Sequence, residues 1–323
     1  MSTAFVTGGS GFIGGRLITR LVADGVHVRA LARSDRSAAA VEALGAQAVR
    51  GDLADVAAMT AGAEGCDTAY HLAANVEQSG PWEDFVRDNV TGTENVLTAT
   101  RSAGVARFVH CGTEAVLIAG EPLHNVDETA PLRPDSPAPY PATKARAEQA
   151  VKDANGEGFE TVVVRPRFVW GAGDTTLLPA MVEMVKAGKF AWIGGGKQLT
   201  DVTHVDNVVE GLVLGARKGR GGEVYFVTDG EPVEFREFVC ALLETQGVTP
   251  PSRSIPTWVA GPLAATSESL WRVFPLPGQP PLTRFTYWVS SQECTINIAK
   301  ARRELGYQPI KDRADGLAEL RAA

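Results

Sequence analysis

The 323-residue chain lacks clusters of cysteine or histidine. Its four cysteines form no Cys-x-x-Cys pair and its five histidines are scattered, so we expect neither a disulfide framework nor a metal site. Apolar runs of the ~18 residues that a membrane span requires are missing, as is a charged segment followed by an apolar run at the N-terminus. These absences predict a cytoplasmic protein without a membrane span.

Dense basic stretches are absent as well. The 31 lysines and arginines are outnumbered by 38 acidic residues, which gives a net charge of −7 and argues against nucleic acid or an anionic membrane as a partner. Hydrophobic residues make up 44% of the chain, an ordinary value for a folded globular protein.

The first half of the chain alternates short β-branched runs with amphipathic stretches. Helices are expected over 13–22, 82–103 and 140–154, and strands over 4–7, 26–32, 46–49, 68–72, 107–110 and 160–164. This alternation is typical of βαβ units, so the predicted fold class is α/β, with a doubly wound parallel sheet of the Rossmann type.

The pattern changes after residue 166, where proline, glycine and tryptophan become frequent. We therefore expect a nucleotide-binding domain over 1–166 and a smaller α/β substrate-binding region over 167–323, with some segments returning to the first sheet. Expected elements there are a strand at 223–228, a loop at 275–281, and helices near 177–188, 206–217, 234–246 and 297–305.

A glycine-rich turn follows the first expected strand and opens the first helix. Glycines at its three key positions permit a tight turn, close backbone approach to a pyrophosphate, and close packing of helix on strand. The helix N-terminus would then face the phosphates with free N–H groups. A plain glycine-rich turn is the alternative; the residues predicted to contact a dinucleotide are Gly8, Ser10, Gly11, Phe12, Ile13 and Gly14.

The end of the second expected strand carries Arg33 and Ser34, where an NAD-binding chain would have a carboxylate. A guanidinium suits a 2′-phosphate in charge and geometry, so NADP(H) is predicted over NAD(H). Asp52 and Leu53, after the third strand, are expected at the adenine. The alternatives are an exposed loop arginine and an exposed turn aspartate.

Tyr140 and Lys144 are four residues apart at a helix start and share one helix face. A nearby ammonium would lower the pKa of the phenol, which could then exchange a proton with a substrate oxygen. Thr113, just after the fifth strand, is the candidate to hold that oxygen. Asn89 is left open between a water-holding role in a proton relay and helix packing.

Together these motifs resemble the extended short-chain dehydrogenase/reductase family. The resemblance covers the first 170 residues and rests on Thr7–Gly14, Gly51–Leu53, Leu72–Ala74, Asn89–Asn95, Thr113, Tyr140–Lys144 and Arg165–Pro166. It implies that Lys144 also binds the ribose hydroxyls, and that further cofactor contacts come from Leu72, Ala73, Ala74, Pro166, Phe168 and Val169. The family usually has serine where Thr113 stands, and often a second serine where Gly112 stands, so the chain departs from the family here. The resemblance also leads us to expect a homodimer formed through the helices over 82–103 and 140–154.

Two positions help to choose a branch of that family. Sugar-nucleotide epimerases carry an arginine for the substrate diphosphate where Thr200 stands here, and sugar dehydratases have an acidic pair after the active-site threonine, matched only by Glu114. Glu114 is interpreted as a solvated or hydrogen-bonded loop residue. The segments 168–171, 206–208, 280–285 and 301–309 resemble the 3β-hydroxysteroid dehydrogenase and sterol-dehydrogenase-like branch.

The function expected from this resemblance is an NADP(H)-dependent oxidoreductase that interconverts a bulky hydrophobic ketone and its secondary alcohol. The second half contains a set of aromatic residues of which about a third are expected to touch substrate, the others being core or lid packing. The whole set is Phe168, Trp170, Trp192, Trp258, Trp271, Phe274, Phe285 and Trp288. The alternatives are a sugar-nucleotide epimerase or dehydratase and a non-catalytic NADP sensor.

Overall fold

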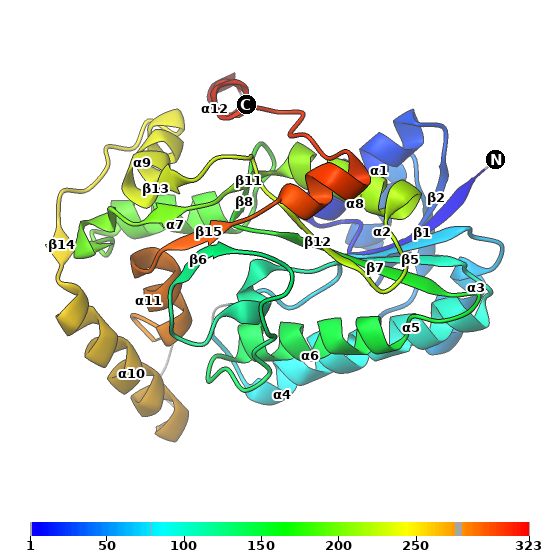
Figure 1. Ribbon diagram of the computed structural model, residues 1–323, viewed down its shortest axis with the longest axis horizontal. Coiled ribbons are helices and arrows are strands. Elements are labelled where there is room, and N and C mark those ends of the chain that lie inside the picture. Colours follow the sequence, from blue (N-terminus) through cyan, green and yellow to red (C-terminus); the bar gives the residue numbers. More distant parts are fainter. Residues whose placement is uncertain (1, 78, 275–279, 323) are drawn as a thin grey trace.

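A seven-stranded parallel sheet lies at the centre of the computed structural model, which describes residues 2–77, 79–274 and 280–322 (Figure 1). All neighbouring strands run parallel. The strand order reverses between β1 and β4, which is where such sheets bind ligands. The order is β12 (Val224–Val227), β7 (Glu160–Pro166), β5 (Arg107–Cys111), β4 (Thr68–His71), β1 (Thr3–Thr7), β2 (His27–Ala32), β3 (Gln47–Arg50).

Helices cover both faces of this sheet, which confirms the predicted doubly wound fold (Figure 1). The side chains of β1 alternate between two apolar cores, with Val6 on one face and Phe5 on the other. The first face packs against α1 (Phe12–Ala23), α2 (Asp35–Ala43) and α8 (Val205–Lys218). The second packs against α3 (Val56–Ala63), α5 (Gly92–Ser102) and α6 (Pro139–Asp153).

The helix predicted over 82–103 is present but contains a widened turn. It consists of α4 (Trp82–Phe85), the π-helical η1 (Val86–Thr91) and α5. Such turns occur often at functional sites. Asn89 lies within η1 and is buried.

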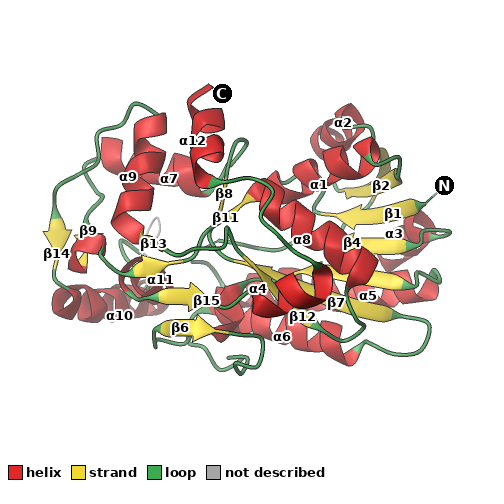
Figure 2. Ribbon diagram, turned by 45° about the horizontal axis from the view of Figure 1, so that its top comes forward, coloured by secondary structure: helices red, strands yellow, loops and turns green. Residues whose placement is uncertain are grey.

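The second half of the chain, together with β6 from the first half, forms three smaller sheets beside the large sheet (Figure 2). The four-stranded sheet has the order β13 (Val233–Glu234), β10 (Leu199–Thr200), β15 (Cys294–Ile296), β6 (Leu123–Val126). The two-stranded sheets are β11 (Thr203–His204) with β8 (Val169–Trp170), and β14 (Ser254–Ile255) with β9 (Trp192–Ile193). The remaining helices are α7 (Leu177–Lys186), α9 (Phe235–Thr245), α10 (Thr257–Val273), α11 (Arg284–Ser291), α12 (Arg313–Ala322), η2 (Glu114–Leu117), η3 (Gly194–Gly196) and η4 (Ala301–Leu305).

The expected elements of this half lie within a few residues of α7, α8, α9 and β12. The predicted helix over 297–305 begins only at residue 299 and ends in the π-helical η4. Of the loop expected at 275–281, residues 275–279 lie outside the described residues. Within the described ranges, no helix combines the length and apolar character needed to cross a bilayer.

Candidate active site

The glycine turn joins β1 to α1 and packs directly on the backbone that follows β4. Gly8 has a φ of +75°, and a Cβ there would lie 2.6 Å from the Ala73 nitrogen. A Cβ on Gly14 would lie 2.1 Å from the Gly8 oxygen. Any side chain at either position would therefore push the turn away from Leu72–Ala74 or unwind the start of α1.

The first turn of α1 is open to an anion. Gly11 is the N-cap, no side chain caps the helix, and its first turn contains no acidic residue. Ser10 and Gly11 are exposed, and Phe12 is partly buried. Free N–H groups at an uncapped helix start, beside backbone that only glycine permits, suit a pyrophosphate, so the residues fit a dinucleotide cofactor.

The predicted specificity residues follow β2 and β3. Arg33 is exposed and, among the described residues, has no ion-pair partner. The Ser34 hydroxyl is engaged in capping α2, where it accepts from the Ser37 nitrogen at 3.2 Å. Asp52 is exposed and its Oδ1 accepts from the Ala54 nitrogen at 2.8 Å. The Arg33 guanidinium is thus available to bind a ligand, whereas the Ser34 hydroxyl is used to cap α2.

Tyr140 and Thr113 are brought together by the first turn of α6 and the end of β5. Thr113 is buried, and its hydroxyl lies near the half-buried Tyr140. Burial raises the pKa of the Tyr140 phenol, the nearby Glu114 charge raises it further, and the neighbouring Thr113 hydroxyl opposes them. In this structure burial and Glu114 therefore outweigh any lowering of the pKa of this phenol.

Lys144 does not act on that phenol here because its ammonium is held elsewhere. Its Nζ donates to the Cys111 carbonyl at 3.1 Å and lies 3.3 Å from the His110 Nε2. Burial lowers the pKa of Lys144. The sequence predicts that Tyr140 and Lys144 share one helix face, but it does not predict that the Lys144 ammonium lies against His110.

Glu114 was expected to be solvated or hydrogen-bonded, and only the second description holds, since the residue is 5% exposed. Its Oε2 accepts from the Thr113 hydroxyl at 2.8 Å, and its Oε1 lies 2.6 Å from Arg167 Nη1. Arg167 is 1% exposed and donates through Nε to the Thr200 hydroxyl at 3.0 Å. A buried ion pair thus stands directly behind the candidate site, and sequence reasoning missed it.

A second buried ion pair explains the glycine before Thr113. Arg165 on β7 donates to Glu148 on α6 from two nitrogens, with Nε to Oε2 at 2.9 Å. A Cβ on Gly112 would lie 2.9 Å from the Val163 side chain and 3.2 Å from Arg165 Cγ. The space that a serine would need is therefore filled by β7 and its arginine.

Asn89 uses its amide to join helices and loops. Its Oδ1 accepts from the Asn75 nitrogen at 2.7 Å, and its Nδ2 donates to the Asn75 oxygen and to the Thr143 hydroxyl, both at 3.1 Å. These bonds engage both amide hydrogens, so the structure favours the packing role over water-holding.

The aromatic residues of the second half divide into core and site. Trp170 and Trp192 are fully buried in the cores around α9, and Phe168 packs edge-on against Phe235. The ring of Phe285 on α11, by contrast, lies 5.5 Å from that of Tyr140, in a cluster that also contains Ile118 and Trp288. The candidate site therefore has an apolar wall on the side of α11.

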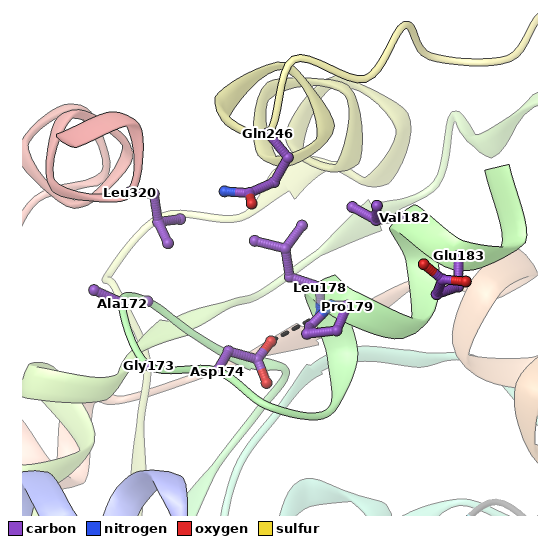
Figure 3. A pocket seen from close by; sticks show the side chains of 10 residues that line it. Ala172, Gly173, Asp174, Leu178, Pro179, Val182, Glu183, Gln246 and Leu320 are labelled. Atoms are coloured by element: carbon purple, nitrogen blue, oxygen red, sulfur yellow. Dashed lines mark hydrogen bonds between the residues drawn. The ribbon is translucent and has the colours of Figure 1, made fainter. Parts of the chain in front are cut away.

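A cavity of about 350 Å³ lies between α7, the end of α9 and α12 (Figure 3). Leu178 and Leu320 line it, Gln246 reaches over it, and the Leu178 nitrogen donates to Asp174 at its edge. Neither Thr113 nor Tyr140 lines this cavity, so it is not the candidate site.

Comparison with known proteins relates the whole chain to oxidoreductases. Residues 5–257 match the 3-beta hydroxysteroid dehydrogenase/isomerase family. The chain is 49% identical to a 4-hydroxy-2-methyl-3-oxo-4-farnesyl-3,4-dihydroquinoline-1-oxide ketoreductase of Stigmatella aurantiaca, over 99% of this chain and 96% of that protein. It is 36% identical to a 2-alkyl-3-oxoalkanoate reductase of Stenotrophomonas maltophilia, over 98% of both chains.

A solved structure is similar over nearly the same length. The dTDP-glucose 4,6-dehydratase DesIV of Streptomyces venezuelae, with NAD bound, superposes with a TM-score of 0.77 at 25% identity, over 99% of this chain and 96% of that one.

Proposed function

The chain belongs to the 3-beta hydroxysteroid dehydrogenase/isomerase family of NAD(P)-dependent oxidoreductases, and we propose that it reduces a bulky hydrophobic ketone to a secondary alcohol with NADPH. The observation that carries this proposal is the position of the Tyr140 phenol, between the Thr113 hydroxyl and the apolar wall of α11. A polar pair at the edge of an apolar surface suits a carbonyl on a hydrophobic body.

The names of two relatives support the substrate class. Both describe reduction of an oxo group, in one case on a molecule with a farnesyl chain and in the other on an alkyl-substituted oxoalkanoate. We infer that the substrate here likewise carries an apolar chain or ring system beside the ketone. Phe285, Ile118 and Trp288 would pack against that part of the molecule.

The preference for NADPH rests on Arg33, which is exposed at the end of β2 with its guanidinium unpaired among the described residues. It would pair with the 2′-phosphate, while the open start of α1 takes the pyrophosphate. Asp52 and Leu53 would meet the adenine, and Leu72–Ala74, Pro166, Phe168 and Val169 would border the rest of the cofactor. When bound, the cofactor supplies the hydride.

The protein's own part in the reaction is to hold the ketone and deliver a proton. Tyr140 would donate its phenolic proton to the carbonyl oxygen as the carbon is reduced, and Thr113 would contact the same oxygen. Lys144 would leave the Cys111 carbonyl to bind the ribose hydroxyls, which would bring its charge to bear on the phenol.

The sugar-nucleotide alternative lacks support at one specific position. Thr200 is fully buried and accepts a hydrogen bond from Arg167, so it offers nothing to a substrate diphosphate.

The test is an NADPH-consumption assay on purified protein with steroid ketones, alkyl-3-oxoalkanoates and prenylated ring ketones, beside UDP- and dTDP-sugars. The proposal expects alcohol formation with release of NADP⁺ at each turnover of an apolar ketone. Activity confined to the nucleotide sugars, with the cofactor retained, would establish the epimerase or dehydratase alternative. Tight NADPH binding without turnover of any compound would establish the sensor.

A further inference from the structure

We propose that Glu114 is a positioning residue for the reduction, which anchors the Thr113 hydroxyl and keeps the neighbouring Tyr140 phenol protonated, ready to donate. The inference rests on the proposed function, because it concerns the proton that Tyr140 would deliver. It is carried by the geometry around Glu114, a buried carboxylate one residue beyond the candidate threonine.

The hydrogen bonds of Thr113 leave its hydroxyl one free acceptor site. Its single proton is donated to Glu114 Oε2 at 2.8 Å, and the Ala115 nitrogen donates to Thr113 Oγ1 at 3.2 Å. A hydroxyl has one proton and two lone pairs, so one lone pair remains. While Glu114 accepts that proton, Thr113 lies beside the ketone oxygen without donating to it, and Tyr140 is the donor.

Arg167 is the ion-pair partner of Glu114 in this buried position. The two groups form an ion pair of 2.6 Å between side chains that are 7% and 1% exposed. Removing either charge alone would leave the other buried without a partner, which is costly. The Arg167 guanidinium is in turn held by Thr200 on β10, so the pair joins the end of β5 to the small sheet of the second half.

In this structure, with Lys144 bonded to Cys111, the groups that face the Tyr140 phenol favour its neutral form. Glu114 and Cys111 approach from the end of β5, and both raise the pKa of the phenol, after burial. On α6 the Lys144 ammonium is bonded to the Cys111 carbonyl, and α11 contributes the uncharged Phe285 ring. Arg167 lies behind Glu114. A fixed negative charge beside a phenol favours its neutral, proton-bearing form.

The experiment is the pH dependence of kcat/KM for ketone reduction, at saturating NADPH, in the wild type and in Glu114→Gln. Loss of the charge lowers the pKa of Tyr140, so the alkaline limb of the profile should move to lower pH by about one unit. Thr200→Val is the matched control, because it removes the other partner of Arg167 and leaves Glu114 in place; its alkaline limb should coincide with that of the wild type. Glu114→Asp retains the charge and should restore most of the wild-type position.

A folded Glu114→Gln variant whose alkaline limb stays at the wild-type pH overturns the inference, even if its overall activity falls. If that variant fails to fold, the double variant Glu114→Gln, Arg167→Met removes both buried charges, so neither is left without its partner. It should show the same downward shift, and an unmoved limb would again overturn the inference. If Tyr140→Phe retains turnover, the proposed role of the phenol has failed; if only the limb fails to move, the role of Glu114 alone has failed.

Discussion

The glycine turn and the Tyr140 cluster are both parts of the candidate site, but different forces hold them. The turn is kept in place by close backbone contact, with Gly8 against Ala73 and Gly14 against Gly8. The Tyr140 cluster is instead kept in place by buried charges, of which Glu114 and Arg167 are the nearest pair. A substitution in the glycine turn should therefore impair function through a steric clash. A substitution in the Tyr140 cluster should impair it through a change in protonation.

The largest expected effect is at the phenol. Tyr140→Phe removes the proton donor and should lower kcat by about 10² to 10⁴-fold, while NADPH still binds. Turnover and fluorescence titration of NADPH check the two parts. Tyr287→Phe, in the same apolar cluster, is the control and should stay near the wild type. A comparable loss in both variants would assign the effect to packing.

The next effect concerns the choice of cofactor. Arg33→Ala should lower the ratio of kcat/KM for NADPH over NADH by about 10- to 100-fold, because a charged hydrogen bond contributes ~1.5–3 kcal/mol. Arg36→Ala, equally exposed in the first turn of α2, should leave the ratio unchanged. An unchanged ratio in Arg33→Ala would show that another group selects the cofactor.

A smaller effect is expected at the glycine turn. Gly8→Ala combines a φ of +75° with a Cβ 2.6 Å from the Ala73 nitrogen. The strain of about 1–3 kcal/mol should weaken NADPH binding by about tenfold or more. Gly25→Ala has nearly the same φ of +76° but no atom within 4 Å of its Cβ, so it isolates the backbone strain. Equal NADPH affinity in the two variants would mean that contact with Ala73 does not matter.

The smallest effect is one of stability in acid. His71 is buried between the Thr7 and Thr93 hydroxyls, and burial lowers its pKa to about 3 from the ordinary 6.5. As the pH falls, the imidazole of His71 is protonated in the unfolded chain before it is protonated in the folded protein. The contribution of neutral His71 to stability is therefore complete above pH 6.5 and is lost as the pH falls toward 3. The loss is at most about 1.4 kcal/mol per pH unit.

Urea unfolding at neutral and mildly acidic pH measures this loss directly. The His71→Gln variant should lose less stability than the wild type over the same acidification. Parallel pH dependences in the two proteins would show that carboxylates elsewhere in the chain dominate its acid sensitivity.

The contrast between the two parts of the site also explains which parts the sequence could predict. The turn at Gly8 and the helix face of Tyr140 and Lys144 are local patterns, so spacing alone locates them. Glu114 and Arg167 are 53 residues apart and meet only because β5 and β7 are neighbours in the sheet. No local pattern joins them, and the effect of Glu114 on the Tyr140 pKa was therefore missed.

Secondary-structure elements differ in the same way in how far the sequence predicts them. Periodicity predicted the long strands and helices of the parallel sheet, but strands of two residues, such as β8 and β11, are too short to show it. Helix α10 contains Gly261 and Pro262, residues that argue against a helix in isolation. In the structure α10 packs against α11, and the Tyr287 side chain lies beside Gly261.

The central claim is that the protein transfers a hydride to an apolar ketone and a proton from Tyr140 to its oxygen. The most direct test is turnover with NADPH that carries deuterium at its transferable position. We expect deuterium on the carbinol carbon of the product, in step with NADP⁺ released, in the wild type, and the same labelled product formed about 10² to 10⁴-fold more slowly in Tyr140→Phe. An unlabelled product, or equal rates of labelled product with both proteins, would contradict the claim.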